Sequence, residues 1–182
     1  MTDSSRTFLI AQTWDGRPLP EGKQATVMLS RDEDGLVVLV DAPFHDDPPP
    51  PGPAGATDGL WNHEVVELFI AQAPSGDGPW RYTEIELSPH GHFLVLKLEG
   101  VRNVVERGLP LDFTAAISEE RWQGRARLPR ALLPPPPHLV NAFALHGHGP
   151  GRRFLVHAPL PCHLRGSAPD FHRPEGFVNL EL

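Results

Sequence analysis

Proline is the residue that most constrains this chain, because 22 of its 182 residues are proline and 17 are glycine. Proline lacks a backbone N–H donor and breaks helix interiors, so a sequence this rich in proline disfavours long helices. Two runs of four prolines occupy residues 48–51 and 134–137, and such runs favour an extended polyproline conformation outside any sheet ladder. We therefore expect an all-β fold with proline-rich surface loops at 43–59 and 134–138.

Composition narrows the class of protein further. The chain is 40% hydrophobic and 21% charged, which is ordinary globular usage, and its length suits a single domain over 1–182. Sixteen basic against 23 acidic residues disfavour nucleic-acid binding, which needs a Lys/Arg footprint on phosphates. No stretch approaches the roughly 20 apolar residues of a membrane helix. Residues 1–6 are polar without a signal-peptide pattern, so we expect a cytoplasmic protein with no membrane partner.

Short apolar runs between turn residues indicate antiparallel β-structure. Residues 27–30 and 36–42 are joined by an Asp-Gly turn, and the alternating segment 81–88 is followed by the apolar segment 93–98; both pairs predict hairpins. Residues 130–133 are expected to form a single helical turn. This spacing of short strands predicts a two-sheet antiparallel sandwich, jelly-roll or immunoglobulin-like. Further strands are expected at 61–70, 112–118, 122–128, 139–146, 153–156 and 176–180.

Glutamates stand out on the central strands. Glu64 and Glu67 interrupt the apolar segment 61–70, and Glu84 and Glu86 share one face of the next strand with Tyr82. A carboxylate buried in such a strand needs a partner, because burying it alone costs several kcal/mol or shifts its pKa. Arginines that could pair with these carboxylates are Arg102, Arg125, Arg127 and Arg153.

These carboxylates admit several interpretations. They could form the solvated face of an edge hairpin, hold a hard cation such as a structural calcium, bind sugar hydroxyls, or act as general acid and base. The sequence alone leaves these four alternatives open.

Histidines provide a second candidate site. The sequence contains His90-Gly91-His92 and His146-Gly147-His148, and an i, i+2 pair on a strand can share a metal ion. The metal candidates are His90, His146 and His172, with His63 as a further possible ligand. The alternative is that these are surface or hydrogen-bonding histidines.

Four tryptophans provide a third candidate. Trp14, Trp61, Trp80 and Trp122 lie near the ends of expected strands or in loops. A flat ring beside polar groups suits the face of a pyranose, whereas the alternative is that each tryptophan anchors the sandwich core.

The central segments resemble a known but uncharacterised family. Residues 60–70 (LWNHEVVELFI) and 82–91 (YTEIELSPHG) resemble the family that includes the human chromosome 4 open reading frame 33 protein. The likeness extends through most of the chain, including Trp14-Asp15-Gly16 and Pro169-Asp170-Phe171-His172. The function of that family is not established.

The same central pattern is more distantly similar to family 9 carbohydrate-binding modules and to DOMON-like sandwiches. That similarity implies a two-sheet antiparallel sandwich. For family 9 modules it also implies sugar binding between tryptophans, and often a structural calcium.

Together these features predict a non-catalytic module that binds a carbohydrate, a polyol or a similar small molecule. Trp61 would stack on the ligand, polar side chains would bond its hydroxyls, and His90 and His146 would border the pocket. An acid–base or metal-assisted hydrolase or isomerase built on His90, His146, His172 and the carboxylates is the alternative. A protein-interaction domain that docks through its proline runs is a second alternative. The expected polar ligand-binding residues are Glu64, Glu67, Tyr82, Glu84, Glu86, Arg102 and Asn103.

Overall fold

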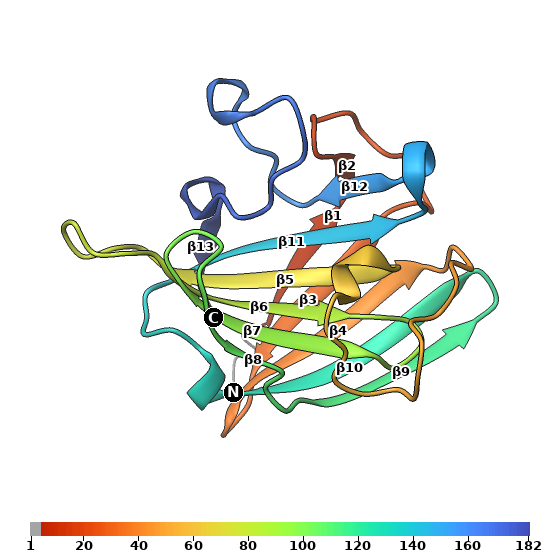
Figure 1. Ribbon diagram of the computed structural model, residues 1–182, viewed down its shortest axis with the longest axis horizontal. Coiled ribbons are helices and arrows are strands. Elements are labelled where there is room, and N and C mark those ends of the chain that lie inside the picture. Colours follow the sequence, from red (N-terminus) through yellow and green to blue (C-terminus); the bar gives the residue numbers. More distant parts are fainter. Residues whose placement is uncertain (1–4) are drawn as a thin grey trace.

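The computed structural model describes residues 5–182 as two antiparallel β-sheets packed face to face (Figure 1). This architecture confirms the expected two-sheet antiparallel sandwich. The smaller sheet has the order β1 (Ser5–Ile10), β3 (Ala25–Arg31), β4 (Gly35–Pro43), β10 (Arg121–Pro129) and β9 (Asp112–Ser118). The larger sheet has the order β2 (Gln12–Thr13), β12 (Arg153–Val156), β11 (His138–His146), β5 (Val65–Gln72), β6 (Arg81–Leu87), β7 (Phe93–Glu99) and β8 (Val104–Arg107), with β13 (Val178–Leu180) paired to β11.

The two predicted hairpins are confirmed as the pairs β3–β4 and β6–β7, and the strands expected at 112–118 and 122–128 pair with each other as β9–β10. The predicted strand over 61–70 is wrong at its start, because a short 3-10 turn, η1 (Leu60–Asn62), precedes β5. Gly59 enters this turn with φ of 74°, a left-handed conformation that favours glycine. Trp61 therefore lies on a turn at the end of the sheet and not on a strand.

The space between the sheets holds the main hydrophobic core. Alternate residues of each strand point into it, including Val38 from the smaller sheet and Leu68 from the larger sheet, both almost fully buried. Trp122 belongs to this core and is 1% exposed. Arg125 and Arg127 of the same strand point to solvent, as expected for a strand with one wet face.

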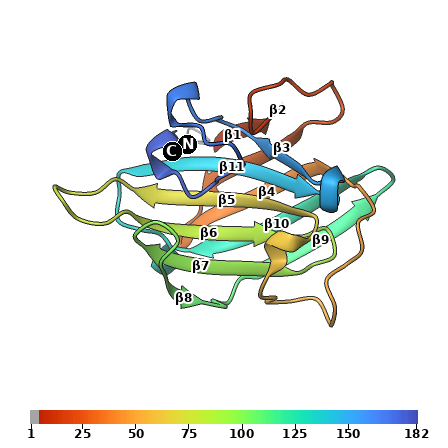
Figure 2. The same ribbon diagram turned by 45° about the horizontal axis from the view of Figure 1, so that its top comes forward.

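The outer face of the larger sheet, turned away from the smaller sheet, is also covered. A second apolar cluster on this face includes Phe69, Phe143 and Phe177. Phe171, from the segment that follows β12, stacks on Phe143 with ring centroids 4.0 Å apart. The blue C-terminal segment in Figures 1 and 2 supplies this cover. Burial on both faces explains why β5 is apolar along almost its whole length.

The two proline runs lie in loops. Residues 44–59 contain no named strand, and Pro48 and Pro49 are exposed. The second run follows the 3-10 turn η2 (Arg130–Leu132), which confirms the expected single turn of helix. No helix within residues 5–182 is long and apolar enough to cross a membrane. Residues 1–4, on which the expected location partly rests, lie outside the described part of the chain.

Candidate functional site

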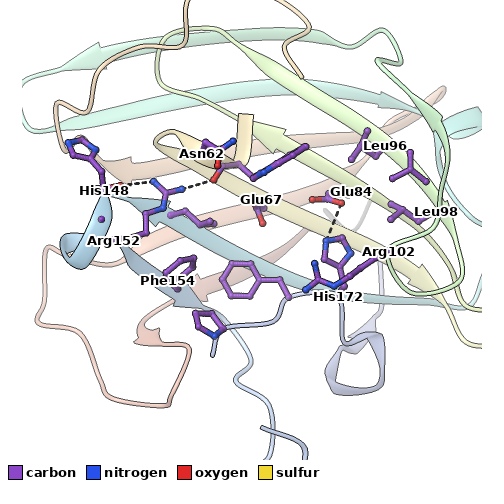
Figure 3. A pocket seen from close by; sticks show the side chains of 17 residues that line it. Asn62, Glu67, Glu84, Leu96, Leu98, Arg102, His148, Arg152, Phe154 and His172 are labelled. Carbon is purple, nitrogen blue, oxygen red and sulfur yellow. Dashed lines mark hydrogen bonds and ion pairs between the residues drawn. The ribbon is translucent and has the colours of Figure 1, made fainter. Parts of the chain in front are cut away.

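A cavity of about 790 Å³ opens over the outer face of the larger sheet. Its wall is formed by η1, by the turn that leads into β12, and by the C-terminal segment (Figure 3). The side chains and glycines that line it are Trp61, Asn62, Glu67, Glu84, Leu96, Leu98, Arg102, Val104, Leu145, Gly147, His148, Gly149, Arg152, Phe154, Pro169, Phe171 and His172.

The cavity combines an apolar wall with an exposed tryptophan. Trp61 is 41% exposed, although its neighbour Leu60 is fully buried and anchors the turn. Phe154 and Phe171 lie on the wall, with ring centroids 6.1 Å apart. Aromatic side chains that remain accessible in a cavity are typical of sites for flat or amphipathic ligands.

Arg152 fixes the position of Trp61. Its Nη2 donates hydrogen bonds to the backbone carbonyls of Trp61 (2.7 Å) and His63 (2.9 Å), and its Nη1 donates to the carbonyl of Gly147 (2.8 Å) (Figure 3). The guanidinium also lies 5.9 Å from the ring centroid of Phe154. Because a guanidinium offers several donors in a rigid fork, one side chain can join the two turns that border the cavity.

Three glutamates occupy the floor of the site. Glu67 is 3% exposed, Glu84 4% and Glu86 0%, which contradicts the interpretation of this surface as a solvated face. Each of them offers a carboxylate oxygen, and these oxygens lie within 4.8 Å of one another. Burial raises the pKa of Glu84 to about 7 and raises the pKa values of Glu67 and Glu86 well above the ordinary value.

One of the expected arginines, Arg102, acts on these carboxylates, because its charge favours the ionised form of Glu84. Arg125 and Arg127 point to solvent on the other sheet. Arg102 binds Asp170 at 2.6 Å. The cationic group whose charge favours the ionised form of Glu67 is Arg152, the neighbour in sequence of the expected Arg153.

A chain of polar groups connects Glu84 to the rim of the cavity. The Tyr82 hydroxyl and His172 Nδ1 are hydrogen-bonded at 2.9 Å. Figure 3 shows His172 facing Glu84, with Nε2 of the imidazole 3.9 Å from Oε2 of the carboxylate. The backbone N–H of Arg102 donates to the Tyr82 hydroxyl oxygen at 2.9 Å. Burial lowers the pKa of His172 to about 4, so its imidazole is neutral at neutral pH.

The structure therefore places some of the expected ligand-binding residues together at the cavity and places the others elsewhere. Trp61, Glu67, Glu84 and Arg102 line the cavity, with Glu86 and Tyr82 directly behind this lining. The members that lie elsewhere are Glu64, His90, Asn103 and His146.

Two of these four residues have structural partners of their own. Glu64 is buried, and its carboxylate accepts hydrogen bonds from the backbone N–H groups of His45 (3.0 Å) and Asp47 (3.4 Å). It lies immediately before β5 and supports the loop after β4. Asn103 donates from Nδ2 to the carbonyl of Glu99 at 2.9 Å and closes the turn between β7 and β8.

The three histidines proposed as metal ligands are not brought together. His90 lies against the ring of Phe44, and His146 stacks on His45 with ring centroids 3.4 Å apart, whereas His172 faces Glu84. Among residues 5–182, the one group of three or more side chains with metal-ligand spacing is the glutamate cluster Glu67, Glu84 and Glu86.

The sequence analysis missed several residues of the cavity. His148 lines it in place of His146, because the backbone turns at Gly147 with φ of 75°. Arg152 and Phe171 were missed because they lie outside the expected strands, and Phe154 was missed because a four-residue strand does not indicate which face borders a cavity. The one signal for His148 was its spacing from His146.

The tryptophans divide between the two expected roles. Trp122 anchors the core, Trp80 packs against the outer apolar cluster, and Trp14 borders a separate small pocket with Arg165. Trp61 alone among the four lines the large cavity.

Proteins from vertebrates align with almost the whole chain. The UPF0462 protein C4orf33 homolog of Danio rerio is 40% identical over 179 residues, covering 96% of this chain and 88% of that protein. The homolog of Mus musculus is 41% identical over 174 residues, covering 93% and 88%, and the Homo sapiens protein is 39% identical over 179 residues, covering 96% and 87%. The chain belongs to the UPF0462 family. This confirms the family resemblance seen in the sequence, and no family model matches the chain.

A solved structure resembles the UPF0462 chain over nearly its full length. It is a crystal structure from Bacteroides uniformis described as a "putative carbohydrate-binding protein", with a TM-score of 0.69 and 14% identity. The match covers 97% of this chain and 85% of that one. At this identity the likeness supports the shared fold.

Proposed function

We propose that this protein is a non-catalytic module that binds a carbohydrate or polyol in the cavity over the outer face of the larger sheet. The observation that carries the proposal is the placement of an accessible tryptophan, Trp61, beside a floor that contains the buried carboxylates of Glu67 and Glu84. The volume of about 790 Å³ falls within the range of roughly 300–1,000 Å³ usual for small-molecule sites.

The cavity has an apolar aromatic wall and a polar floor, which match the apolar C–H face and the hydroxyl groups of a sugar. The C–H face of a sugar ring is apolar and would pack on Trp61 or on the wall formed by Phe154 and Phe171. Sugar hydroxyls would donate to the carboxylate oxygens of the floor, which are strong acceptors in a buried site. Glu84 Oε2 has no hydrogen-bond partner within the described chain, so a bound hydroxyl would satisfy it.

The comparison with the Bacteroides uniformis protein supports the proposal through its description. The sequence similarity to family 9 carbohydrate-binding modules also supports carbohydrate binding, because it lies in β5 and β6, the strands that carry the floor of the cavity.

Calorimetric titration with a panel of neutral monosaccharides, disaccharides and alditols tests this function. We expect binding in the millimolar range or tighter for some member, and a loss of about tenfold or more in Trp61→Ala, since stacking aromatics contribute most to such sites. Leu9→Ala is the matched control, because Leu9 is 42% exposed on β1 of the other sheet. A folded protein that binds no member of the panel would exclude this function.

An acid–base enzyme is the second candidate, and one observation favours it. Glu84, with a pKa of about 7, faces the neutral imidazole of His172, and a group with such a pKa can act as a general acid near neutral pH. Turnover of aryl glycosides that is lost in Glu84→Gln would favour an enzyme over a binding module.

A further inference from the structure

Glu86 presents an unusual electrostatic problem. Its side chain is completely buried, and neither oxygen of the ionised carboxylate has a hydrogen-bond partner among the described residues, although a protonated Glu86 carboxyl can share a hydrogen bond with Glu84. One oxygen of Glu84 is in the same condition. Buried polar atoms normally have a partner, and a buried carboxylate without one is strongly unfavourable.

The direct cross-strand neighbours of Glu84 and Glu86 supply no positive charge. The cross-strand neighbours of Glu86 are Leu94 on β7 and Glu67 on β5, and those of Glu84 are Leu96 and Phe69. The imidazole Nε2 of His172 approaches Glu84 Oε2 only to 3.9 Å, which is longer than a hydrogen bond.

The two nearby arginines do not neutralise the cluster. Arg152 approaches Glu67 but donates three of its hydrogen bonds to backbone carbonyls, and Arg102 is paired with Asp170. Three acidic groups therefore share one buried space with two partial counter-charges, Arg152 near Glu67 and Arg102 near Glu84.

We propose that Glu67, Glu84 and Glu86 bind one divalent cation of the class that prefers oxygen ligands, namely Ca²⁺, Mg²⁺ or Mn²⁺. Each glutamate offers an oxygen within 4.8 Å of the other two, and oxygens that share a cation at 2.0–2.6 Å can be at most about 5.2 Å apart. The oxygens of Glu86 lie below the accessible surface. A bare ion that lies among the three side chains, on the outer face of β5 and β6, can reach these oxygens. The head group of an organic cation in the cavity would contact only Glu67 and Glu84.

The position of the ion also suggests what it does. Glu67 and Glu84 line the cavity, so three carboxylates would hold the ion from below while its remaining coordination positions face the cavity. Ca²⁺ takes six to eight oxygen ligands and Mg²⁺ takes six, so sites for exogenous oxygens remain. On the proposed carbohydrate function, on which this second step rests, two neighbouring hydroxyls of the ligand would occupy those sites.

Metal binding to chelator-treated protein tests the site without any sugar. We expect calorimetry with Mn²⁺, Ca²⁺ and Mg²⁺ at neutral pH to give one site per chain for at least one ion, with a rise in Tm of several degrees. Glu86→Gln should weaken this binding at least tenfold, because it removes an anionic ligand, and should remain folded, because an uncharged amide of the same size is easier to bury than a carboxyl that ionises in water. Glu106→Gln is the matched control, since Glu106 is an exposed glutamate of β8 that pairs with Lys97.

The outcomes separate this proposal from the carbohydrate function. No heat and no Tm change with all three ions would overturn it, as would binding that Glu86→Gln and Glu84→Gln leave unchanged. A Tm rise with methylammonium but not with the metals would overturn it in favour of an organic cation. Sugar binding that is unchanged by a chelator would overturn the coordination of ligand hydroxyls by the ion, but it would leave the carbohydrate function standing. Binding of one metal ion per chain without any sugar binding would support the metal site and count against the carbohydrate function.

Discussion

Glu67 on β5 and Glu86 on β6 are direct cross-strand neighbours in the antiparallel register, and both side chains are buried. Two ionised carboxylates directly opposite each other destabilise a sheet, and burial raises the pKa of both. The fold therefore loses free energy at neutral pH whether it keeps them ionised or holds them protonated. Packing alone does not explain why two buried carboxyl groups lie opposite each other, whereas a divalent cation bound between them would explain it.

Glu86→Gln should stabilise the metal-free protein. Burial raises the pKa of Glu86 well above its ordinary value, so at pH 8 the fold must hold this carboxyl protonated or bury its charge, whereas the unfolded chain ionises it freely. An amide of the same size avoids this cost, so we expect a gain of about 1–3 kcal/mol in the free energy of unfolding at pH 8. Urea denaturation in the presence of a chelator measures it. The exposed Glu106→Gln should stay within about 0.5 kcal/mol of wild type, and a lower urea midpoint for Glu86→Gln would contradict the electrostatic argument.

Arg152 should be essential for the shape of the cavity. Arg152→Ala removes three hydrogen bonds to the carbonyls of Trp61, His63 and Gly147, and we expect a loss of about 1–3 kcal/mol in stability. Arg152→Lys keeps the charge but lacks the fork that spans three carbonyls, so it should recover only part of the loss. Full recovery by lysine in thermal unfolding would show that charge alone matters at this position.

Gly147 should tolerate no side chain. A Cβ there would lie 2.8 Å from the Gly151 carbonyl oxygen, and its φ is +75°. We expect Gly147→Ala to cost about 2–4 kcal/mol, from left-handed strain plus a backbone clash. Gly149→Ala is the matched control, because its φ is +51° and nothing lies within 4 Å of its Cβ position. Equal losses for the two variants in chemical denaturation would refute the clash.

The stacked pair of His45 and His146 should weaken the fold in acid. Burial lowers the pKa of His146 to about 4 and also lowers that of His45. A histidine with a depressed folded pKa contributes its full stability above the unfolded pKa, about 6.5, and loses it as the pH falls from there toward 4. After allowance for partial exposure, we expect a loss of about 1–2 kcal/mol.

The variant His45→Phe/His146→Phe keeps the stacking and should lose less stability than wild type between pH 6.5 and 4. Denaturation curves are compared at each pH, because the pKa of Glu64 is raised to about 7 and this residue titrates in the opposite sense. Parallel pH profiles for wild type and variant would exclude this role for the pair.

Much of the fold could be predicted from local patterns. The Asp-Gly turn before β4 and the alternation in β6 are short-range signals, so both hairpins were found. The turn η1 was missed, since its apolar residues continue without a break into β5. Its conformation depends on Gly59 and on the distant Arg152, a relationship that periodicity does not record.

The candidate site was predictable where its residues lie on strands. Glu67, Glu84 and Glu86 were found because charged residues interrupt apolar or alternating segments at known faces. His148 and Phe171 could not be found, because the chain brings them to the cavity through a turn and an irregular C-terminal segment. Phe154 lies on the expected strand β12, but the sequence does not indicate which face of that strand borders a cavity. His90 and His146 were misplaced for the same reason: glycine turns beside them decide which way each ring points.

The most direct test of the carbohydrate site uses the four tryptophan indole N–H signals in a ¹H–¹⁵N spectrum, with Trp61 assigned through Trp61→Phe. We expect a binding sugar or alditol from the panel to shift the Trp61 signal in a saturable way. The signals of Trp14, Trp80 and Trp122, which lie outside the cavity lining, should stay in place. A saturable shift confined to Trp14 or Trp80, or no shift at millimolar ligand in a folded protein, would contradict the account.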